Sequence, residues 1–206
     1  MSTETIKIPR PTRIELLRLR RRLSLARRFH SLLRDREIYL LEVFRETLKS
    51  VVEARKRLNE LLVKAYTSYY TAIYLHGFEA LEAYSSTVPA TVKLQVSYKN
   101  IMGVWSYSYN ILDMPTPQPH LPLELSELQL TRREILELLT RIAEYEKALV
   151  NLGAEIRRLR RIVNMLEKVY IPRLERTIRY LTMKFDEMRR EETIRAIKIK
   201  RRIARE

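Results

Sequence analysis

At 206 residues and a formal net charge of +15, the chain has room for one or two ordinary domains, yet its composition argues against an ordinary globule. Three glycines, no cysteine and an abundance of Leu, Arg, Glu, Ile, Ala and Lys favour long helices and exclude disulfides and thiolate chemistry. No apolar run approaches the roughly 20 residues of a membrane span, and no signal peptide opens the chain, so we expect a soluble intracellular protein. The positive charge favours an acidic partner of some kind, whether nucleic acid, an anionic membrane or an acidic protein surface.

The first predicted element is a helix over residues 12–76, preceded by an N-terminal tail of residues 1–11. Neither proline nor glycine interrupts this stretch. Thr12 followed by Glu15 fits a capping box, in which a hydroxyl and a carboxylate satisfy backbone amides at the start of a helix. At 1.5 Å per residue the helix would be roughly 95 Å long, far beyond the mean for globular proteins.

A seven-residue apolar repeat runs through this helix, starting with Leu16 at position a. Fourteen of its eighteen a and d positions are apolar, which predicts a left-handed coiled coil. His30 and Glu37 are polar residues at consecutive a positions, and we interpret them as fixing the register of the seam; a third chain contacting the pair at Glu37 is the alternative. The seam residues that we single out here are Leu16, Leu23, Phe44, Val51 and Leu58.

A connecting region follows over residues 77–125. Apolar residues alternate from Val92 onward, which predicts a short β-hairpin near residues 91–104 that turns near Lys99 and Asn100. A proline-rich loop comes after it. A single hairpin is marginal in water, so we expect this one to pack on helix ends or on a partner.

The last predicted element is a second coiled-coil helix over residues 126–206, which ends in a basic tail. All eleven a and d positions from Ile135 to Tyr170 are apolar. Beyond Tyr170 the apolar stripe slips by one residue at Pro172, where we expect a local bend because proline removes a backbone donor. The seam residues that we single out here are Leu149, Ile156 and Val163.

Each helix must bury its stripe, and the simplest solution is for the two to pack against each other. The connecting region lets the chain double back, so we predict an all-α protein: a long antiparallel two-helix left-handed coiled coil, with the hairpin and loop at the end distal to the termini. A parallel pair would need the connection to run about 90 Å along the rod.

No signature of catalysis is present. Three scattered glycines cannot form a phosphate-binding loop, and three well-separated histidines without cysteine form no recognisable metal-binding pair. We therefore predict no catalytic, metal or cofactor site. The tyrosines around Tyr66, Tyr69, Tyr70 and Tyr74, and again at Tyr98, Tyr107 and Tyr109, have two interpretations: packing of the thicker end of the rod, which we favour, or stacking of single-stranded nucleic acid.

The arginine-rich start of the first helix is not the basic region of a DNA-binding zipper. Such a region lacks the leucines of its zipper, whereas Leu16, Leu19 and Leu23 continue the seam through these arginines. An antiparallel partner brings residues 197–206 to the same place, which predicts one positive tip. That tip is either a solvated charged face, a contact with acidic or polar groups of another protein, or a nucleic-acid contact.

Two blocks resemble the ends of the D subunit of archaeal A-type and vacuolar-type rotary ATPases. PTRIELLRLRRRLSLARRFHSLLRDR (residues 11–36) is similar to the N-terminal helix of that family, and RRIVNMLEKVYIPRLERTIRYLTMKFDEMRREE (residues 160–192) to its C-terminal block. Positions that match the signature within the second block are Asn164, Leu166, Glu167, Ile171, Pro172, Arg173 and Glu175. A short hairpin motif is matched by Asn100, Ile101, Met102 and Gly103.

The resemblance implies a non-catalytic central-stalk rotor component that couples ATP synthesis or hydrolysis to proton or sodium-ion translocation. It implies contacts with the catalytic hexamer of A and B subunits, with the F subunit of the stalk, and with the C/d adaptor of the membrane ring. The protein would then be a peripheral component at the cytoplasmic face of the cell membrane, with no direct nucleotide and no nucleic acid. The residues that we expect to bear on the hexamer are Arg18, Arg20, Arg21, Arg22, Lys200, Arg201 and Arg202. A basic coiled-coil protein that binds nucleic acid is the alternative, and a homodimeric structural coiled coil is a third possibility.

Overall fold

The computed structural model describes residues 12–87, 92–114 and 123–204. The chain divides into two compact units, and each is treated separately below. Unit 1 comprises Met1–Glu37 and Arg157–Glu206, and unit 2 comprises Ile38–Ile156. The predicted N-terminal tail and most of the proline-rich loop lie outside the described residues.

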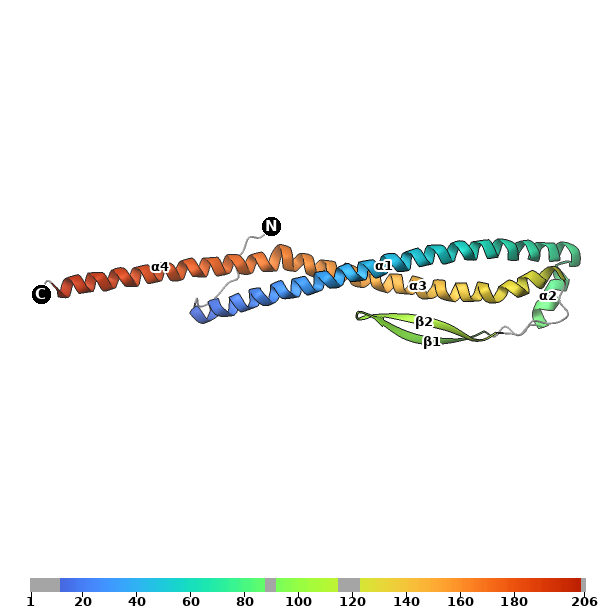
Figure 1. The fold of residues 1–206 in the computed structure, drawn as a ribbon, viewed down its shortest axis with the longest axis horizontal. Coiled ribbons are helices and arrows are strands. Elements are labelled where there is room, and N and C mark those ends of the chain that lie inside the picture. Colours follow the sequence, from blue (N-terminus) through green and yellow to red (C-terminus); the bar gives the residue numbers. More distant parts are fainter. Residues whose placement is uncertain (1–11, 88–91, 115–122, 205–206) are drawn as a thin grey trace. The chain divides into compact units, whose positions relative to one another are not determined.

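Long helices dominate both units (Figure 1). In chain order the elements are α1 Arg13–His76, α2 Phe78–Thr87, β1 Lys93–Ile101, β2 Val104–Asp113, the 3₁₀ turn η1 Leu123–Leu125, α3 Ser126–Met165, the π-helical turn η2 Leu166–Tyr170, and α4 Ile171–Ile203. The prediction of long helices with apolar seams, accompanied by an antiparallel β-hairpin, is confirmed. Across the described residues, none of the helices combines the length and the apolar character that crossing a membrane requires.

In unit 1, the start of α1 packs antiparallel against α4. The core is a cluster of buried side chains, flanked by partly buried ones that include Leu16 and Phe185. Arg27 Nη2 lies 2.7 Å from Glu175 Oε1 across the pair. The buried members of the cluster are Leu19, Ala26, Leu174 and Leu181.

The π-helical turn η2 takes up the one-residue slip of the apolar stripe. Val163, which precedes the turn, and Leu166, its first residue, face the seam. After the turn Ile171 and Leu174 do, so the turn holds one residue more than a regular α-helix would. The backbone N–H of Ile171 donates to the carbonyl of Leu166, the spacing that defines a π-turn. Pro172, whose missing N–H cannot join a helical ladder, then stands in the first turn of α4. The sequence located this irregularity, and the structure identifies it as an inserted residue.

In unit 2, the remainder of α1 packs against α3. Leu58 is buried with Leu138 and Ile142, so residues from both predicted seams meet. Two ion pairs span the same helices: Arg55 with Glu146, and Arg57 with Glu134 at 2.9 Å from Nε to Oε1. Every seam residue singled out from the sequence is buried or half-buried in its unit.

The helix α1 ends at Gly77, whose φ of +78° is readily adopted only by glycine. The short helix α2, which was not predicted from the sequence, follows at once and buries Leu81 against Ala72 and Leu125. His76 Nε2 lies 3.2 Å from Glu124 Oε2, which links the end of α1 to η1. Together these contacts close one end of unit 2.

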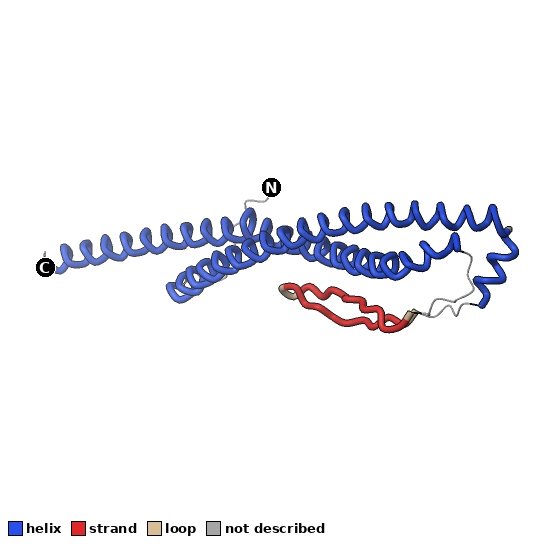
Figure 2. Tube along the Cα trace, turned by 45° about the vertical axis from the view of Figure 1, so that its right-hand side comes forward, coloured by secondary structure: helices blue, strands red, loops and turns tan. Residues whose placement is uncertain are grey.

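The hairpin β1–β2 is longer than predicted and turns later. Its strands cover residues 93–113 rather than 91–104, and its turn lies at Met102 and Gly103 rather than near Lys99 and Asn100. Both turn residues have positive φ, +48° and +87°, as in a type I′ turn, whose twist suits a two-residue hairpin. Figure 2 shows the two strands joined by this turn and lying beside helical segments of unit 2.

Candidate interaction surfaces

The arginines at the start of α1 point away from the seam. Arg18, Arg20, Arg21 and Arg22 are all exposed, whereas Leu19 among them is only 1% exposed and packs in the core of unit 1. Arg18 Nη1 lies 3.4 Å from Glu15 Oε2 within the same helix. The prediction that the leucine seam continues through the arginines is therefore confirmed.

The basic group of α4 lies beyond the start of α1. Counting nine residues outward along both antiparallel helices from the Arg27–Glu175 pair puts Arg18 level with Lys184. Lys200 lies sixteen residues further, about 24 Å along the helix axis. The prediction of one shared basic tip is thus wrong, because α4 continues past the first residue of α1 (Figure 1).

The overhanging part of α4, residues 190–204, is exposed along its whole length. Residues 194–204 carry five basic residues and no acidic one, and three of the five are Lys200, Arg201 and Arg202. The exposed apolar residues in this segment are Ile194, Ile197, Ile199 and Ile203. A helix that shows both bulky apolar and basic side chains to solvent is a candidate contact for a partner with an acidic and partly apolar surface.

The two polar residues at a positions of the α1 seam, His30 and Glu37, face charged residues across unit 1. His30 Nε2 lies 3.6 Å from Glu167 Oε2, and Glu37 Oε1 accepts a hydrogen bond from Arg160 Nε at 2.9 Å. No hydrogen-bond partner for His30 Nε2 is present among the described residues. Their role in fixing register stays a prediction, with the contact to a third chain at Glu37 as its alternative.

In unit 2, the hairpin rests on α3 through β2. Ser108 Oγ donates to Glu144 Oε2 at 3.2 Å, and Asn151 Nδ2 donates to the carbonyl of Trp105 at 2.8 Å. At the turn, Asn100 Oδ1 accepts the backbone N–H of Gly103 at 2.7 Å, with Met102 exposed at the tip. Asn100 and Gly103 thus shape the turn.

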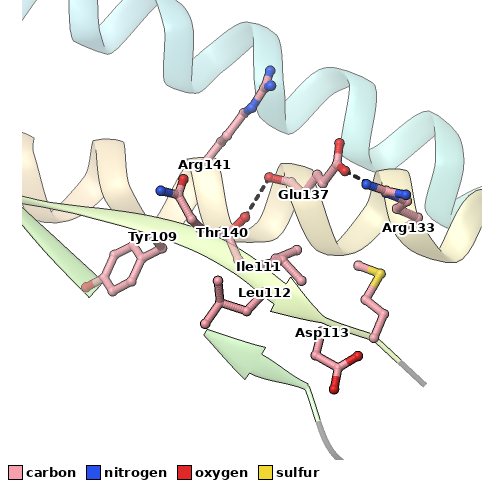
Figure 3. Close-up of a pocket in the computed structure, with 10 residues that line it drawn as sticks. Tyr109, Ile111, Leu112, Asp113, Arg133, Glu137, Thr140 and Arg141 are labelled. Atoms are coloured by element: carbon pink, nitrogen blue, oxygen red, sulfur yellow. Dashed lines mark hydrogen bonds and ion pairs between the residues drawn. The ribbon is translucent and has the colours of Figure 1, made fainter. Parts of the chain in front are cut away.

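A cleft of about 500 Å³ lies between the far end of β2 and α3 (Figure 3). Its floor on α3 includes Arg133, whose Nε lies 3.0 Å from Glu137 Oε1, and Thr140, whose hydroxyl donates to the Glu137 carbonyl at 2.9 Å. Asp113 on β2 is paired with Lys93 at 3.3 Å. The charges of this cleft are therefore largely satisfied by local partners, and they do not converge on a common point.

A second, more apolar hollow of about 270 Å³ lies around α2. Tyr69, Phe78, Leu81 and Leu125 are among the residues that line it. The recurrence of Phe78, Leu81 and Tyr84 directly after Gly77 is the sequence signal that would have revealed this helix and its apolar face.

A hydrogen bond from its own backbone, and then one from His76, lower the pKa of the Glu124 carboxyl below its ordinary value. Within the described residues, no group of three or more potential metal ligands comes together. The local perturbation at Glu124 thus reflects its pairing at the end of α1.

Three of the four tyrosines singled out near the end of α1 do not pack in the interior of unit 2. Tyr66, Tyr70 and Tyr74 are exposed, and Tyr66 and Tyr70 stack on each other with ring centroids 6.4 Å apart. Only Tyr69 packs against the buried cluster at the end of α1. The packing interpretation that we favoured is wrong for the other three residues.

Comparison with known proteins covers nearly the whole chain. The family of the ATP synthase D subunit matches residues 15–201. The chain belongs to this D-subunit family. The D subunit of the V-type ATP synthase of Acetivibrio thermocellus is 35% identical over 198 residues, covering 92% of this chain and 89% of that protein. The D subunit of the A-type ATP synthase of Pyrococcus horikoshii is 32% identical, and that of Thermococcus sibiricus 30%; each alignment covers 96% of this chain and 95% of the relative.

The match to the D-subunit family extends across both units. It includes the arginines at the start of α1 and nearly all of α4, ending one residue before Arg202. The part of the chain that matches the family therefore contains the seams, the hairpin, the π-turn and most of the overhanging part of α4.

Proposed function

We propose that this chain is the central-stalk rotor shaft of an A/V-type ATP synthase. As a non-catalytic component, it would couple ATP synthesis or hydrolysis in the hexamer of A and B subunits to ion translocation through the membrane ring. Membership of the D-subunit family over residues 15–201 supports this proposal, together with relatives that are named as D subunits of A-type and V-type ATP synthases.

The observation that carries the mechanical part of the proposal is the continuity of the paired seam within each unit. A shaft transmits torque only if its helices do not slide or untwist under load. Buried leucines such as Leu19 and Leu174 in unit 1, and Leu58 and Leu138 in unit 2, resist separation of the helices. Ion pairs across each helix pair, such as Arg27 with Glu175, oppose sliding because a shift of one turn would separate their charges.

The proposed bearing consists of the two basic groups of unit 1. Arg18, Arg20, Arg21 and Arg22 form one group, and Lys200, Arg201 and Arg202 form the other. All seven side chains are exposed. The first group surrounds Leu19 of the seam, and the second lies on the part of α4 that extends beyond the start of α1. Because the groups lie about 24 Å apart along α4, we expect two levels of contact with the bore of the A and B hexamer.

Further partners follow from the same proposal. The F subunit would bind alongside the coiled coil, and the C/d adaptor would connect the chain to the membrane ring. The protein would then be peripheral, held at the cytoplasmic face of the cell membrane through the complex. No direct nucleotide, cofactor or nucleic-acid contact is part of the proposal.

The test separates coupling from assembly. One variant replaces Lys200, Arg201 and Arg202 with Gln, and a matched control removes the same charge at the exposed positions Arg45, Lys49 and Lys56 of unit 2. The ATPase assembly purified with each variant is reconstituted into liposomes, and ATP hydrolysis is measured beside ATP-driven ion uptake, in proton and in sodium media. We expect the ratio of transport to hydrolysis to fall several-fold for the α4 variant and to stay unchanged for the control.

An unchanged ratio for the α4 variant would refute the bearing assignment, and failure of the wild-type chain to purify with an ATP-hydrolysing assembly would refute the function itself. The nucleic-acid alternative makes a different prediction, since binding of duplex or single strands would weaken steeply with added salt. A homodimeric coiled coil would be dimeric when purified alone.

A further inference from the structure

The hairpin of unit 2 turns its smaller side chains toward α3. Val104 and Ser106 on β2 are buried, and Ser108 donates its hydroxyl to Glu144 of α3. In an antiparallel pair, residues directly opposite each other share a face. The face that carries these three residues, with their β1 partners such as Ser97, is therefore the one that covers the helix.

The opposite face of the hairpin is apolar and open. Leu94 and Val96 on β1 are each 48% exposed, Tyr98 is 71% exposed, and Trp105 on β2 is 61% exposed. Tyr98 contacts its cross-strand partner Tyr107 with ring centroids 5.4 Å apart, which adds to a continuous aromatic and aliphatic ladder. A sheet packed on a helix normally buries its apolar face, so this hairpin has the reverse arrangement and exposes what a partner could cover.

The strand β1 also has an open backbone edge. Within the described residues the sheet has two strands only, and all of β1 except Ile101 at the turn is exposed. In a two-residue type I′ hairpin the pair flanking the turn, here Ile101 and Val104, is the first hydrogen-bonded pair, and hydrogen-bonded and open pairs alternate from there. The open pairs therefore include three residues of β1, whose backbone N–H and C=O groups point away from β2: Tyr98, Val96 and Leu94.

The same three residues of β1 thus carry both the outward backbone groups and the exposed apolar side chains. A partner helix laid over the outer face would cover the side chains but leave the backbone edge without partners. An added strand would satisfy both, since its own apolar side chains would extend the ladder on the outer face. A third strand also converts a marginal two-stranded hairpin into a stable sheet.

We propose that the outer edge of β1 is a docking surface for an extended segment of another protein chain, which pairs with Leu94, Val96 and Tyr98 as a third strand. The segment would carry apolar residues at alternate positions. Acidic residues should stand between these apolar positions of the segment. They would suit Lys99, which is exposed near the turn end of β1, and the strong positive charge of the chain as a whole. This proposal does not require the rotary function, because it follows from the hairpin alone.

The test uses the absence of cysteine from the chain. Single cysteines are placed at Val96, on the outer face of β1, and at Asn110, an exposed control on the other face of β2. The rate of maleimide labelling is compared between the isolated full-length chain and the native particle that contains it. We expect Val96→Cys to react at least tenfold more slowly in the particle, and Asn110→Cys to react at the same rate in both; equal rates for Val96→Cys would overturn the proposal.

Two further variants distinguish a strand from other occupants. Val96→Pro removes an outward N–H and keeps an apolar side chain, whereas Val96→Thr keeps the backbone donor and replaces a methyl group with a hydroxyl. Tyr98→Cys, on the same face, reports protection in both backgrounds. The folding control uses isolated chains that carry Val96→Pro or Val96→Thr and keep Tyr98, in which a retained Tyr98–Tyr107 contact in NMR spectra confirms that the hairpin is folded. A strand requires that both variants weaken protection, by roughly four- to fivefold each on the scale of one lost methyl group or one lost hydrogen bond.

Weakening by Val96→Thr alone would instead indicate a helix on the outer face and would overturn the proposal. Slow labelling of Val96→Cys in the isolated chain, with dimers in sedimentation, would indicate pairing between two copies and would overturn it as well. ATP hydrolysis by the same particle is recorded separately, so that a failure of the rotor assignment is distinguishable from a failure of the docking surface.

Discussion

Deleting one residue from the π-helical turn tests how the seam of unit 1 stays in phase. The turn Leu166–Tyr170 holds one residue more than an α-helix, and the stripe on either side of it is displaced by that residue. Removing exposed Lys168 would turn η2 into a regular α-helical segment. Ile171 and Leu174 would then continue the seven-residue repeat of Val163 and Leu166 without a slip, so we expect the variant to fold with a melting temperature unchanged or raised.

The matched control removes Arg161, an equally exposed residue one to two turns earlier, in regular α-helix. Residues between the deletion and the π-turn then rotate by about 100° relative to α1, which takes Val163 and Leu166 out of the seam. Val163 is buried and Leu166 is half-buried, so at about 1.5–3 kcal/mol for a fully buried aliphatic side chain the loss is roughly 2–5 kcal/mol. For a chain of this size that corresponds to a melting temperature lower by about 10 °C.

Circular dichroism at helical wavelengths during thermal unfolding measures both deletions. If the Lys168 deletion destabilised the chain as much as the Arg161 deletion, the π-turn would not be a phase insertion, and the reasoning would fail. If neither deletion had an effect, the seam of unit 1 would not depend on phase at all. The structure agrees with one result only: the Arg161 deletion lowers the melting temperature and the Lys168 deletion does not.

Two further predictions concern single contacts. Leu174→Ala, in the core of unit 1, should cost about 3 kcal/mol in urea unfolding, whereas Leu25→Ala, on the exposed side of α1, should change stability by less than about 0.5 kcal/mol. Because its hydrogen bonds lower the pKa of Glu124, the carboxylate stabilises the end of α1 above its ordinary pKa of 4.5, and this contribution is lost as pH falls through the lowered value. The protection factors of the amides near His76, which are exchange rates corrected for the intrinsic effect of pH, should therefore fall on acidification in the wild type and much less in Glu124→Gln.

The helices and their seams were predictable because they depend on local chemistry and on periodicity. Thr12 Oγ1 accepts the backbone N–H of Glu15 at 3.3 Å, which is one half of the capping box expected from these two residues. Gly77 ends α1 because its positive φ is costly for any residue with a Cβ. Both ends of α1 could thus be read from single residues.

The hairpin turn was misplaced because alternation alone does not determine where a strand reverses. The apolar alternation of β1 weakens at Lys99 and Asn100, which suggested a turn there. The backbone instead reverses where positive φ is cheapest, at Gly103, with the Asn100 side chain accepting its N–H. The strand β2 was correspondingly underestimated, since its alternating residues continue to Asp113.

The exposed end of α4 was missed for a different reason. A heptad repeat determines which side of a helix faces its partner, but not how far one helix is displaced along the other. That displacement depends on the connecting region and on cross-helix contacts such as Arg27 with Glu175, which cannot be read from either helix alone. The two basic groups looked equivalent in sequence and occupy different levels of unit 1 for this reason.

The polar residues of the seam and the π-turn occupy the same part of unit 1, and this has a mechanical consequence. His30 faces Glu167 inside the turn, and Glu37, one heptad later, faces Arg160 just before it. Over this stretch, polar side chains replace apolar ones at two consecutive a positions of α1, and each faces a partner that is about half exposed, so less apolar contact holds the helices together here. The leucines on the other side of the turn, Leu174 and beyond, are tightly buried. We therefore expect any twisting of unit 1 under load to concentrate where the seam changes phase, while the flanking apolar segments turn as stiff bodies.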